Sequence, residues 1–424
     1  GKVRKHWRYL IDSLDTMGPE ALQQRQRDTV QMLRSDGATY NIYGALDGLN
    51  RTWPLDPVPL LISSSEWAGI ETGLIQRSEL LNLILRDLYG PRSLIRKGPI
   101  PAKLVYTDPG FLRACVVPPA ASAPGLILCA ADLVRCTDGH FRVLKDHSQS
   151  PSGMGYALEN RTVMSRLIPS LFRDSHPHRL APFFRRLRES LAGLAPESGR
   201  DEPRVVIMTP GAHNETYFEH LHLSNYLDYT LIEGANLTVR DGRVWLKSVS
   251  GLEPVDVILR RVDDHYCDPL ELRPDSLLGV PGLVEVVRRG RVAIANPLGA
   301  GVLESPGLMA FLPRLAKHLL GQELRLPSVA TWWCGQQREL DYVLANLPSL
   351  VLRSINRTAG SRPVFGDQLD NAALASWRER IRAQPHLYVG QERLPPSSAP
   401  TLHNGLLEPR QSILRTFLTA SRDS

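Results

Sequence analysis

The clearest candidate for chemistry in the sequence is a loop rich in serine and glycine at residues 148–155. The backbone N–H groups of such a loop can surround a phosphate group, because no bulky side chain shields them. Glu159 and Asn160 follow the loop, and a carboxylate beside a carboxamide offers the oxygen ligands that suit Mg²⁺. The sequence Ser-Pro-Ser-Gly alone does not separate such a site from an ordinary surface loop, which is the commoner structure.

A second candidate site follows an apolar strand expected at residues 256–260, where charges of both signs are concentrated. Ligands of parallel sheets bind where strands end, and the guanidinium groups of Arg260 and Arg261 can each hold a carboxylate or phosphate through paired N–H groups. Asp263 and Asp264 come directly after them. A salt-bridged strand end without any ligand explains the same residues equally well.

Two further patterns are less specific. Residues 292–305 run from a short strand into a glycine-rich turn, but the spacing matches neither a P-loop nor a dinucleotide fingerprint. His213, His220 and His222 lie near or on one expected helix, and His-x-His on a helix does not direct two imidazoles to the same side. We therefore interpret these histidines as surface or capping residues.

Hydrophobic periodicity indicates the elements that must position these residues. It predicts helices at residues 17–34, 66–88 and 179–194, and a hairpin at residues 126–144 that turns at Thr137-Asp138-Gly139. A strand at 204–208, a helix at 214–227 and a strand at 230–232 predict a βαβ unit, hence a parallel sheet with helices on its faces. Further strands are expected at residues 237–240, 244–247, 256–260, 292–295 and 387–391, and a linker at 197–203.

Composition limits the classes of protein to which the chain can belong. The 424 residues include 50 Lys plus Arg and 44 Asp plus Glu, a net charge of +6. That excess suits an anionic ligand such as a nucleotide, but the basic residues are mixed with acids and lack interleaved aromatics, so no nucleic acid is expected. No apolar run approaches ~18 residues, so no membrane span is expected. Five scattered cysteines favour a reducing, cytoplasmic location.

Taken together and in this order, these segments resemble the circularly permuted ATP-grasp family, in the branch related to glutathionylspermidine synthetases. The matching segments are residues 51–62, 80–91, 151–161, 209–220, 246–282, 295–305, 326–336, 363–366 and 388–392. They cover nearly the whole chain. Family sequences typically continue beyond the point at which this one stops, and some relatives carry an additional helical domain there, so a helical partner domain or protein is expected.

The resemblance implies a mixed α/β architecture of α+β lobes that hold ATP between them, with a βαβ substrate-binding lobe. We expect residues 1–200 to combine a helical segment with the permuted metal- and phosphate-binding part. Residues 201–300 are then the substrate-binding lobe, and residues 301–424 the nucleotide lobe with its adenine hinge. The implied activity is carboxylate–amine ligation through an acyl phosphate, with ATP and Mg²⁺ as cofactors and small-molecule or peptide carboxylates and amines as substrates.

The resemblance also assigns roles to individual residues. Those expected to bind metal are Asp132, Asp146 and Glu159. Those expected to contact ATP are Ser152, Gly153, Gly155, Asn160, Lys247, Arg353, Tyr388, Gln391 and Glu392. Those expected to be catalytic are Arg161, Arg260 and Arg261. Those expected to bind substrate are Asn214, Glu219, Asp263, Asp264 and Asn296.

The chain departs from the family pattern at three positions. Relatives place an acidic ligand and an asparagine on the strand where this sequence has Lys145 and His147. A phosphate-binding lysine of relatives is replaced by Arg353, which keeps the charge but not the shape of an ammonium group. These departures motivate an alternative function, a catalytically reduced ATP-grasp protein that binds nucleotide or peptide as a regulatory or assembly partner.

Overall fold

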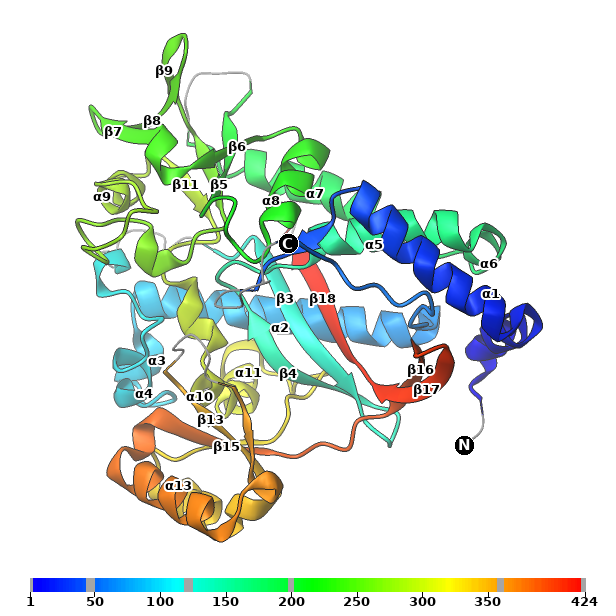
Figure 1. The fold of residues 1–424 in the computed structure, drawn as a ribbon. Coiled ribbons are helices and arrows are strands. Elements are labelled where there is room, and N and C mark those ends of the chain that lie inside the picture. Colours follow the sequence, from blue (N-terminus) through cyan, green and yellow to red (C-terminus); the bar gives the residue numbers. More distant parts are fainter. Residues whose placement is uncertain (1–2, 43–49, 118–124, 197–201, 357–361, 421–424) are drawn as a thin grey trace.

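The computed structural model describes residues 3–42, 50–117, 125–196, 202–356 and 362–420. Its centre is an antiparallel sheet of three strands in the order β18-β3-β4, formed by β3 (Leu128–Arg135), β4 (Phe141–His147) and β18 (Ile413–Thr419). The predicted hairpin is therefore present. Its third strand comes from the far end of the chain, as the red arrow beside the cyan hairpin shows (Figure 1).

Helix α2 (Ser64–Tyr89) covers one face of this central sheet. Ser63 caps the helix in a capping box with Glu66, which satisfies backbone N–H groups that the first turn leaves free. Ile70 and Leu74 of α2 pack against Leu133 and Val143 of the sheet. Side chains alternate between the two faces of a strand, and an irregularity in the β3–β4 register between Asp132 and Leu133 shifts this alternation by one residue on β4, so Asp132 and Lys145 both point to the other face.

The predicted βαβ unit is confirmed as part of a parallel sheet in the order β11-β10-β5-β6. Its strands are β5 (Val205–Thr209), β6 (Thr230–Glu233), β10 (Val257–Arg260) and β11 (Ala293–Ala295). Helices α7 (Ala181–Ala192) and α8 (Tyr217–Leu227) pack on one face, and α9 (Leu283–Arg288) packs on the other. A small antiparallel sheet flanks it, formed by β7 (Leu237–Arg240), β8 (Arg243–Ser248) and β9 (Gly251–Pro254).

A third body lies at the opposite end of the molecule (Figure 1). Its sheet has the order β12-β15-β13-β14, with β12 (Thr331–Trp333), β13 (Leu350–Ser354), β14 (Val364–Phe365) and β15 (Tyr388–Glu392). Helices α12 (Gln337–Asn346) and α13 (Asn371–Ala383) supply side chains to its core. The expected late strand at residues 387–391 is thus confirmed as a central strand of this sheet.

The remaining elements surround the central sheet. Helix α1 (Arg8–Ser35), bent at Gly18, packs against α5 (Met154–Leu167). A hairpin of β16 (Ser398–His403) and β17 (Leu406–Gln411) precedes β18. The shorter elements are β1 (Thr39–Tyr40), β2 (Arg51–Thr52), α3 (Ser93–Arg96), α4 (Ala102–Tyr106), α6 (Pro169–Asp174), α10 (Pro306–Met309) and α11 (Leu312–Leu320). No helix among the described residues is long and apolar enough to span a membrane.

The expected helices at residues 17–34, 66–88 and 179–194 correspond to α1, α2 and α7, although α1 begins nine residues earlier, at Arg8. Most of the expected linker at residues 197–203 lies outside the described residues. The segment 301–424 supplies strands to both the central sheet and the third body. The three-part division of the chain at residues 200 and 300 therefore remains a proposal.

Candidate functional site

One face of the central sheet gathers charged side chains from all three strands. Asp132 of β3 lies directly opposite Lys145 of β4 on one side and Arg415 of β18 on the other. His147 lies two residues beyond Lys145 on β4 and therefore points to the same face. The departures from the family pattern at Lys145 and His147 thus place basic side chains around Asp132.

Asp132 is held tightly by two of these neighbours. Its Oδ1 accepts a hydrogen bond from Nε of Arg415 at 2.7 Å, and Oδ2 accepts from Nη2 of Arg415 at 2.9 Å. Nε2 of His147 lies 2.8 Å from the same Oδ2. Burial acts to raise the pKa of Asp132, but the hydrogen bonds to His147 and Arg415 outweigh it, so the pKa lies below its ordinary value. Asp132 is therefore an ionised carboxylate with both oxygens engaged.

The serine and glycine loop runs from this face to the N-terminus of α5. Arg415 connects the two, because its Nη1 donates to the backbone oxygen of Ser152 at 3.1 Å. Gly153 has a φ of 126°, a conformation that favours glycine, and it immediately precedes the helix. Its N–H donates to both carboxylate oxygens of Glu219, at 2.8 and 2.9 Å, and the N–H of Gly155 donates to Oε1 at 3.2 Å. The helix N-terminus thus already holds an anion, the side chain of Glu219 on α8.

Arg261, which follows β10, places a buried cation beside this helix N-terminus. Its Nη2 donates to Oγ of Ser152 at 2.8 Å and lies 3.8 Å from Oε2 of Glu219. Its side chain is only 1 % exposed, yet Nε and Nη1 have no hydrogen-bond partner among the described residues. Burial lowers the pKa of the guanidinium and Glu219 opposes that shift. Buried N–H groups are nearly always satisfied, so these two donors of Arg261 are an exception among the described residues.

The three predicted metal ligands are not brought together. Asp146 points to the opposite face of the sheet from Asp132, where Nε and Nη2 of Arg77 bind its two oxygens at 2.6 and 2.7 Å. Glu159 faces α1, and burial together with a hydrogen bond to Asp36 raises its pKa to about 7. Within the described ranges no cluster of three or more His, Cys, Asp or Glu side chains could hold a metal ion. The donor set thus does not fit the expected Mg²⁺ site.

Asn296, a predicted substrate ligand, and Arg260, a predicted catalytic residue, instead connect neighbouring segments of the structure. The side chain of Asn296 accepts N–H groups of Ile127 and Leu128 at 2.9 Å each, and donates to the carbonyl of Ser148 at 2.6 Å. Arg260 donates from Nη1 to the backbone carbonyl of Val262 at 2.8 Å and from Nε to that of Asn296 at 3.2 Å. These contacts fix the start of β3 and the serine loop against the parallel sheet.

Two acids, Asp263 and Asp264, follow Arg260 and Arg261 in the chain. Oδ2 of Asp264 accepts the N–H of Gly299 at 2.9 Å and lies 3.6 Å from Arg260, while its Oδ1 has no hydrogen-bond partner among the described residues. Asp263 is exposed, although partial desolvation and the neighbouring charge of Asp264 raise the pKa of its carboxyl group. Asn214 lies in the turn before α8, where its Oδ1 accepts the N–H of Thr216 at 3.0 Å.

The predicted residues on α5 beyond its first turn contact other helices and loops. Asn160 accepts a hydrogen bond from the indole of Trp53 at 2.9 Å. The guanidinium of Arg161 lies 5.8 Å from the ring centre of Phe172. Both side chains therefore pack against neighbouring segments and take part in no contact with Asp132 or Arg261 that the structure records.

The predicted nucleotide contacts of the third body lie on one sheet. Nη1 of Arg353 on β13 donates to Oε1 of Gln391 on β15 at 3.2 Å, and Gln391 donates to Oγ1 of Thr331 at 3.0 Å. Tyr388 and Glu392 are the two ends of the same strand β15. Lys247 lies elsewhere, at an exposed position of β8, where its Nζ donates to the carbonyl of Ala235 at 3.0 Å.

Sequence reasoning missed Arg415, Arg77 and Glu304 as members of this region. Arg415 is 283 residues from its partner Asp132, and no local pattern marks it. Glu304 accepts the backbone N–H groups of Ser148 and Gln149 at 2.8 and 2.7 Å. Of these three residues, only Glu304 lies within a segment that the sequence marked as a candidate for chemistry, the glycine-rich turn at residues 292–305, whereas Arg77 lies within the expected helix at residues 66–88.

Comparison with known proteins identifies the family to which the chain belongs. Uncharacterized proteins of Mycobacterium bovis and Mycobacterium tuberculosis are each 41% identical over 430 residues, which cover 100% of this chain and 48% of theirs. The chain thus spans about half the length of these relatives. A protein of Synechocystis sp. is 37% identical over 99% of this chain and 87% of its own length.

A solved structure has a similar fold. It is that of a glutathione synthetase-like effector from Globodera pallida in its apo form, with a TM-score of 0.58 and 14% identity over 95% of each chain. The family model described as circularly permuted ATP-grasp type 2 matches residues 59–424. The chain therefore belongs to the circularly permuted ATP-grasp family, as its sequence pattern predicted.

Proposed function

We propose that the protein is an ATP-dependent ligase that joins a carboxylate to an amine. Membership of an ATP-grasp family and a fold similar to a glutathione synthetase-like protein support this general class. The observation that carries the proposal within this chain is the buried guanidinium of Arg261, whose Nε and Nη1 lack partners among the described residues. It adjoins the N-terminus of α5 and is linked through Ser152 to Arg415 on the charged face of the central sheet.

In the proposed reaction, an oxygen of the substrate carboxylate attacks the γ-phosphorus of ATP, and the bond from that phosphorus to the bridging oxygen of ADP breaks. The amine nitrogen then attacks the acyl carbon of the resulting acyl phosphate, the carbon–oxygen bond to phosphate breaks, and the nitrogen loses a proton. Both steps shift negative charge between oxygens. Fixed cations and N–H groups stabilise such charge without having to reorganise.

We propose that Arg261 and Arg415 stabilise this negative charge. Lys145 and His147 lie on the same face of the central sheet as Arg415 and add to the positive charge there. The N–H groups of Gly153 and Gly155, now bonded to Glu219, form a second set of donors for an anion. No step is assigned to Mg²⁺, because the expected ligands Asp132, Asp146 and Glu159 point in different directions. We keep the contact of Arg353 and Gln391 with the nucleotide as a proposal that rests on the family resemblance.

One observation favours the second candidate, a nucleotide- or peptide-binding protein with little turnover. Asp132 is the carboxylate on the charged face of the central sheet, and both of its oxygens are already engaged by Arg415 and His147. A protein of this kind would bind ATP tightly and release no ADP with any pair of substrates.

The two candidates separate in one assay. The purified chain is incubated with ATP, Mg²⁺ and a panel of amino acids, short peptides and polyamines, and release of ADP is measured. A ligase releases ADP only when a suitable carboxylate and amine are both present. Arg261→Lys is expected to reduce that release by about 100-fold, as for loss of one preorganised donor group, whereas Arg185→Gln at an exposed position of α7 leaves it unchanged. ATP binding without release by any pair would favour the binding protein.

A further inference from the structure

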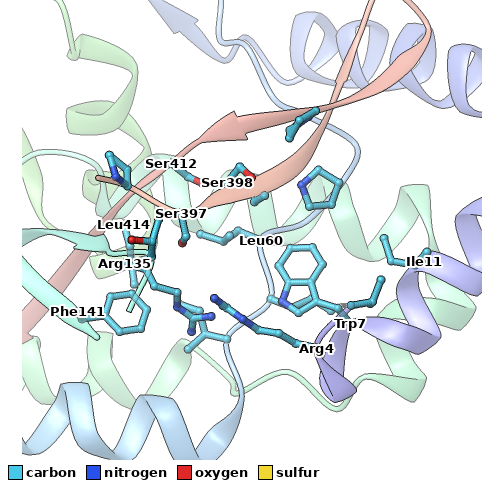
Figure 2. Close-up of a pocket in the computed structure, with 18 of the residues that line it drawn as sticks. Arg4, Trp7, Ile11, Leu60, Arg135, Phe141, Ser397, Ser398, Ser412 and Leu414 are labelled. Atoms are coloured by element: carbon cyan, nitrogen blue, oxygen red, sulfur yellow. The ribbon is translucent and has the colours of Figure 1, made fainter. Parts of the chain in front are cut away.

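A cavity of about 640 Å³ lies away from the charged face of the central sheet. It is lined by the N-terminal segment around Trp7, the segment at residues 60–62, the ends of β3 and β18, and the β16–β17 hairpin (Figure 2). Cavities of about 300–1,000 Å³ are typical of small-molecule sites in proteins. Neither the proposed ligase reaction nor the family resemblance assigns a role to this one.

The walls of the cavity are mostly apolar. Trp7 and Leu60 extend into its middle in Figure 2, and Ile11 and Phe141 lie at its two sides. Trp7 is only 8 % exposed. These side chains form a surface that is complementary to an aliphatic or aromatic group of a ligand.

The polar part of the cavity is basic. The side chains of Arg4 and Arg135 extend toward one another from opposite sides in Figure 2. Arg135 forms an ion pair with Glu66, and its guanidinium lies 4.7 Å from the ring centre of Phe141. Among the residues that the structure describes, the guanidinium of Arg4 has no recorded hydrogen bond or ion pair.

The acids near the cavity are already neutralised. Glu66 is shared between Arg135 and His6, whose Nε2 lies 3.6 Å from it. Glu408 lines the cavity but is bound by Arg410 at 2.6 and 3.1 Å. The charge left over at the cavity is therefore the cation of Arg4, beside a second guanidinium that an anion would also stabilise.

We propose that this cavity is a binding site for a small amphipathic anion, in which Arg4 and Arg135 hold the anionic group and the wall around Trp7 and Leu60 holds the apolar part. The site is separate from the charged face, because Leu133 and Leu414 line the cavity while their chain neighbours Asp132 and Arg415 point to the other face. The same two strands thus carry both sites, one on each face of the sheet.

A matched pair of fluorescent probes tests the proposal on the full chain. 1-Anilinonaphthalene-8-sulfonate carries an aromatic body and an anionic group, and N-phenyl-1-naphthylamine has the same body without the sulfonate. The site is expected to bind the sulfonate at least tenfold more tightly than the neutral probe. Arg4→Gln is expected to remove that difference and to leave the affinity for the neutral probe within twofold. Arg96→Gln, at an exposed position of α3, serves as the control and changes neither affinity.

A second variant locates the probe. Ala399→Trp on β16 fills the cavity and is expected to abolish binding of both probes, while near-ultraviolet circular dichroism confirms that the variant is folded. Decanoate should displace the bound sulfonate at a concentration at least tenfold lower than decanol does. Equal affinities for the two probes, a sulfonate affinity unchanged by Arg4→Gln, or probe binding that survives Ala399→Trp would each overturn the proposal. None of these readouts depends on ligase activity, so the two proposals fail independently.

Discussion

The carboxylate of Glu219 accepts the backbone N–H of Gly153 through both oxygens, at 2.8 and 2.9 Å, and so occupies the N-terminus of α5. Oε2 of the same carboxylate lies 3.8 Å from the buried guanidinium of Arg261. An internal anion thus neutralises a cation and a helix N-terminus that would otherwise be buried without a counter-charge. The same donors are those that we assign to the charge of a bound phosphate or carboxylate.

Glu219→Gln should destabilise the protein and make it respond to phosphate. Removal of the charge leaves Arg261 buried without its ion-pair partner, which costs about 3–5 kcal/mol in comparable buried pairs. Urea unfolding measures the loss. Inorganic phosphate should restore more stability to Glu219→Gln than to the wild type, because the anion replaces the missing carboxylate. Exposed Glu189→Gln is the control, and an equal effect of phosphate on both proteins would contradict an anion site at Arg261.

Asp146→Asn should lower the free energy of unfolding of the protein. Asp146 and Arg77 form a bidentate pair in which both side chains are at least 95% buried, with 5% and 2% exposed. Loss of one charge leaves the other uncompensated, so the free energy of unfolding is expected to fall by about 3–5 kcal/mol. The double variant Arg77→Met/Asp146→Leu should recover most of that loss. Normal stability of Asp146→Asn combined with loss of ATP binding would instead support the original assignment of Asp146 as a metal ligand.

The raised pKa of Glu159 predicts that the free energy of unfolding depends on pH. Its pKa rises from 4.5 to about 7 in the folded protein, chiefly through burial and then through the hydrogen bond to Asp36. The folded state therefore binds more protons than the unfolded state between these pH values, and stability falls as pH rises through that window. Glu159→Gln cannot titrate, so its free energy of unfolding should decline less between pH 4.5 and 7. Parallel curves for variant and wild type would show that Glu159 has no raised pKa.

Arg415→Gln tests the link between the two parts of the site. Arg415 donates to Asp132 and to the carbonyl of Ser152, so its loss releases one side of the Asp132 carboxylate. We expect ATP to bind at least tenfold more weakly, because one cation of the charged face is removed. Isothermal titration with ATP measures this effect, and Arg410→Gln on the exposed hairpin provides a matched control. An unchanged affinity would remove Arg415 from the proposed phosphate contacts.

Local patterns in the sequence were sufficient for many elements. The turn at Thr137-Asp138-Gly139 placed the β3–β4 hairpin, and apolar runs placed the strands of the parallel sheet. The alternation of side chains along β4 also predicts the face to which Asp146 points. Lys145 and His147 flank Asp146, and neighbouring residues on a strand point to opposite faces. The sequence therefore already predicts that Asp146 points away from Lys145 and His147.

Long-range contacts were not available from local patterns. Arg77 lies 69 residues from Asp146, and β18 pairs with β3 across more than half of the chain. The register between β3 and β18 decides that Arg415 faces Asp132, and a shift of one residue would have placed Thr416 there instead. The orientation of Glu159 toward Asp36 likewise depends on how α1 packs against α5, which the composition of neither helix determines.

Transfer of oxygen from the carboxylate to phosphate tests the central claim most directly. The carboxylate and amine that support ADP release are supplied with ¹⁸O in the carboxylate, and the released phosphate is examined by ³¹P nuclear magnetic resonance. The proposed acyl phosphate predicts one ¹⁸O atom in each phosphate, and it predicts that Arg261→Lys releases this labelled phosphate about 100-fold more slowly. Phosphate free of ¹⁸O, or ATP binding without ADP release for every pair in the panel, would contradict the account.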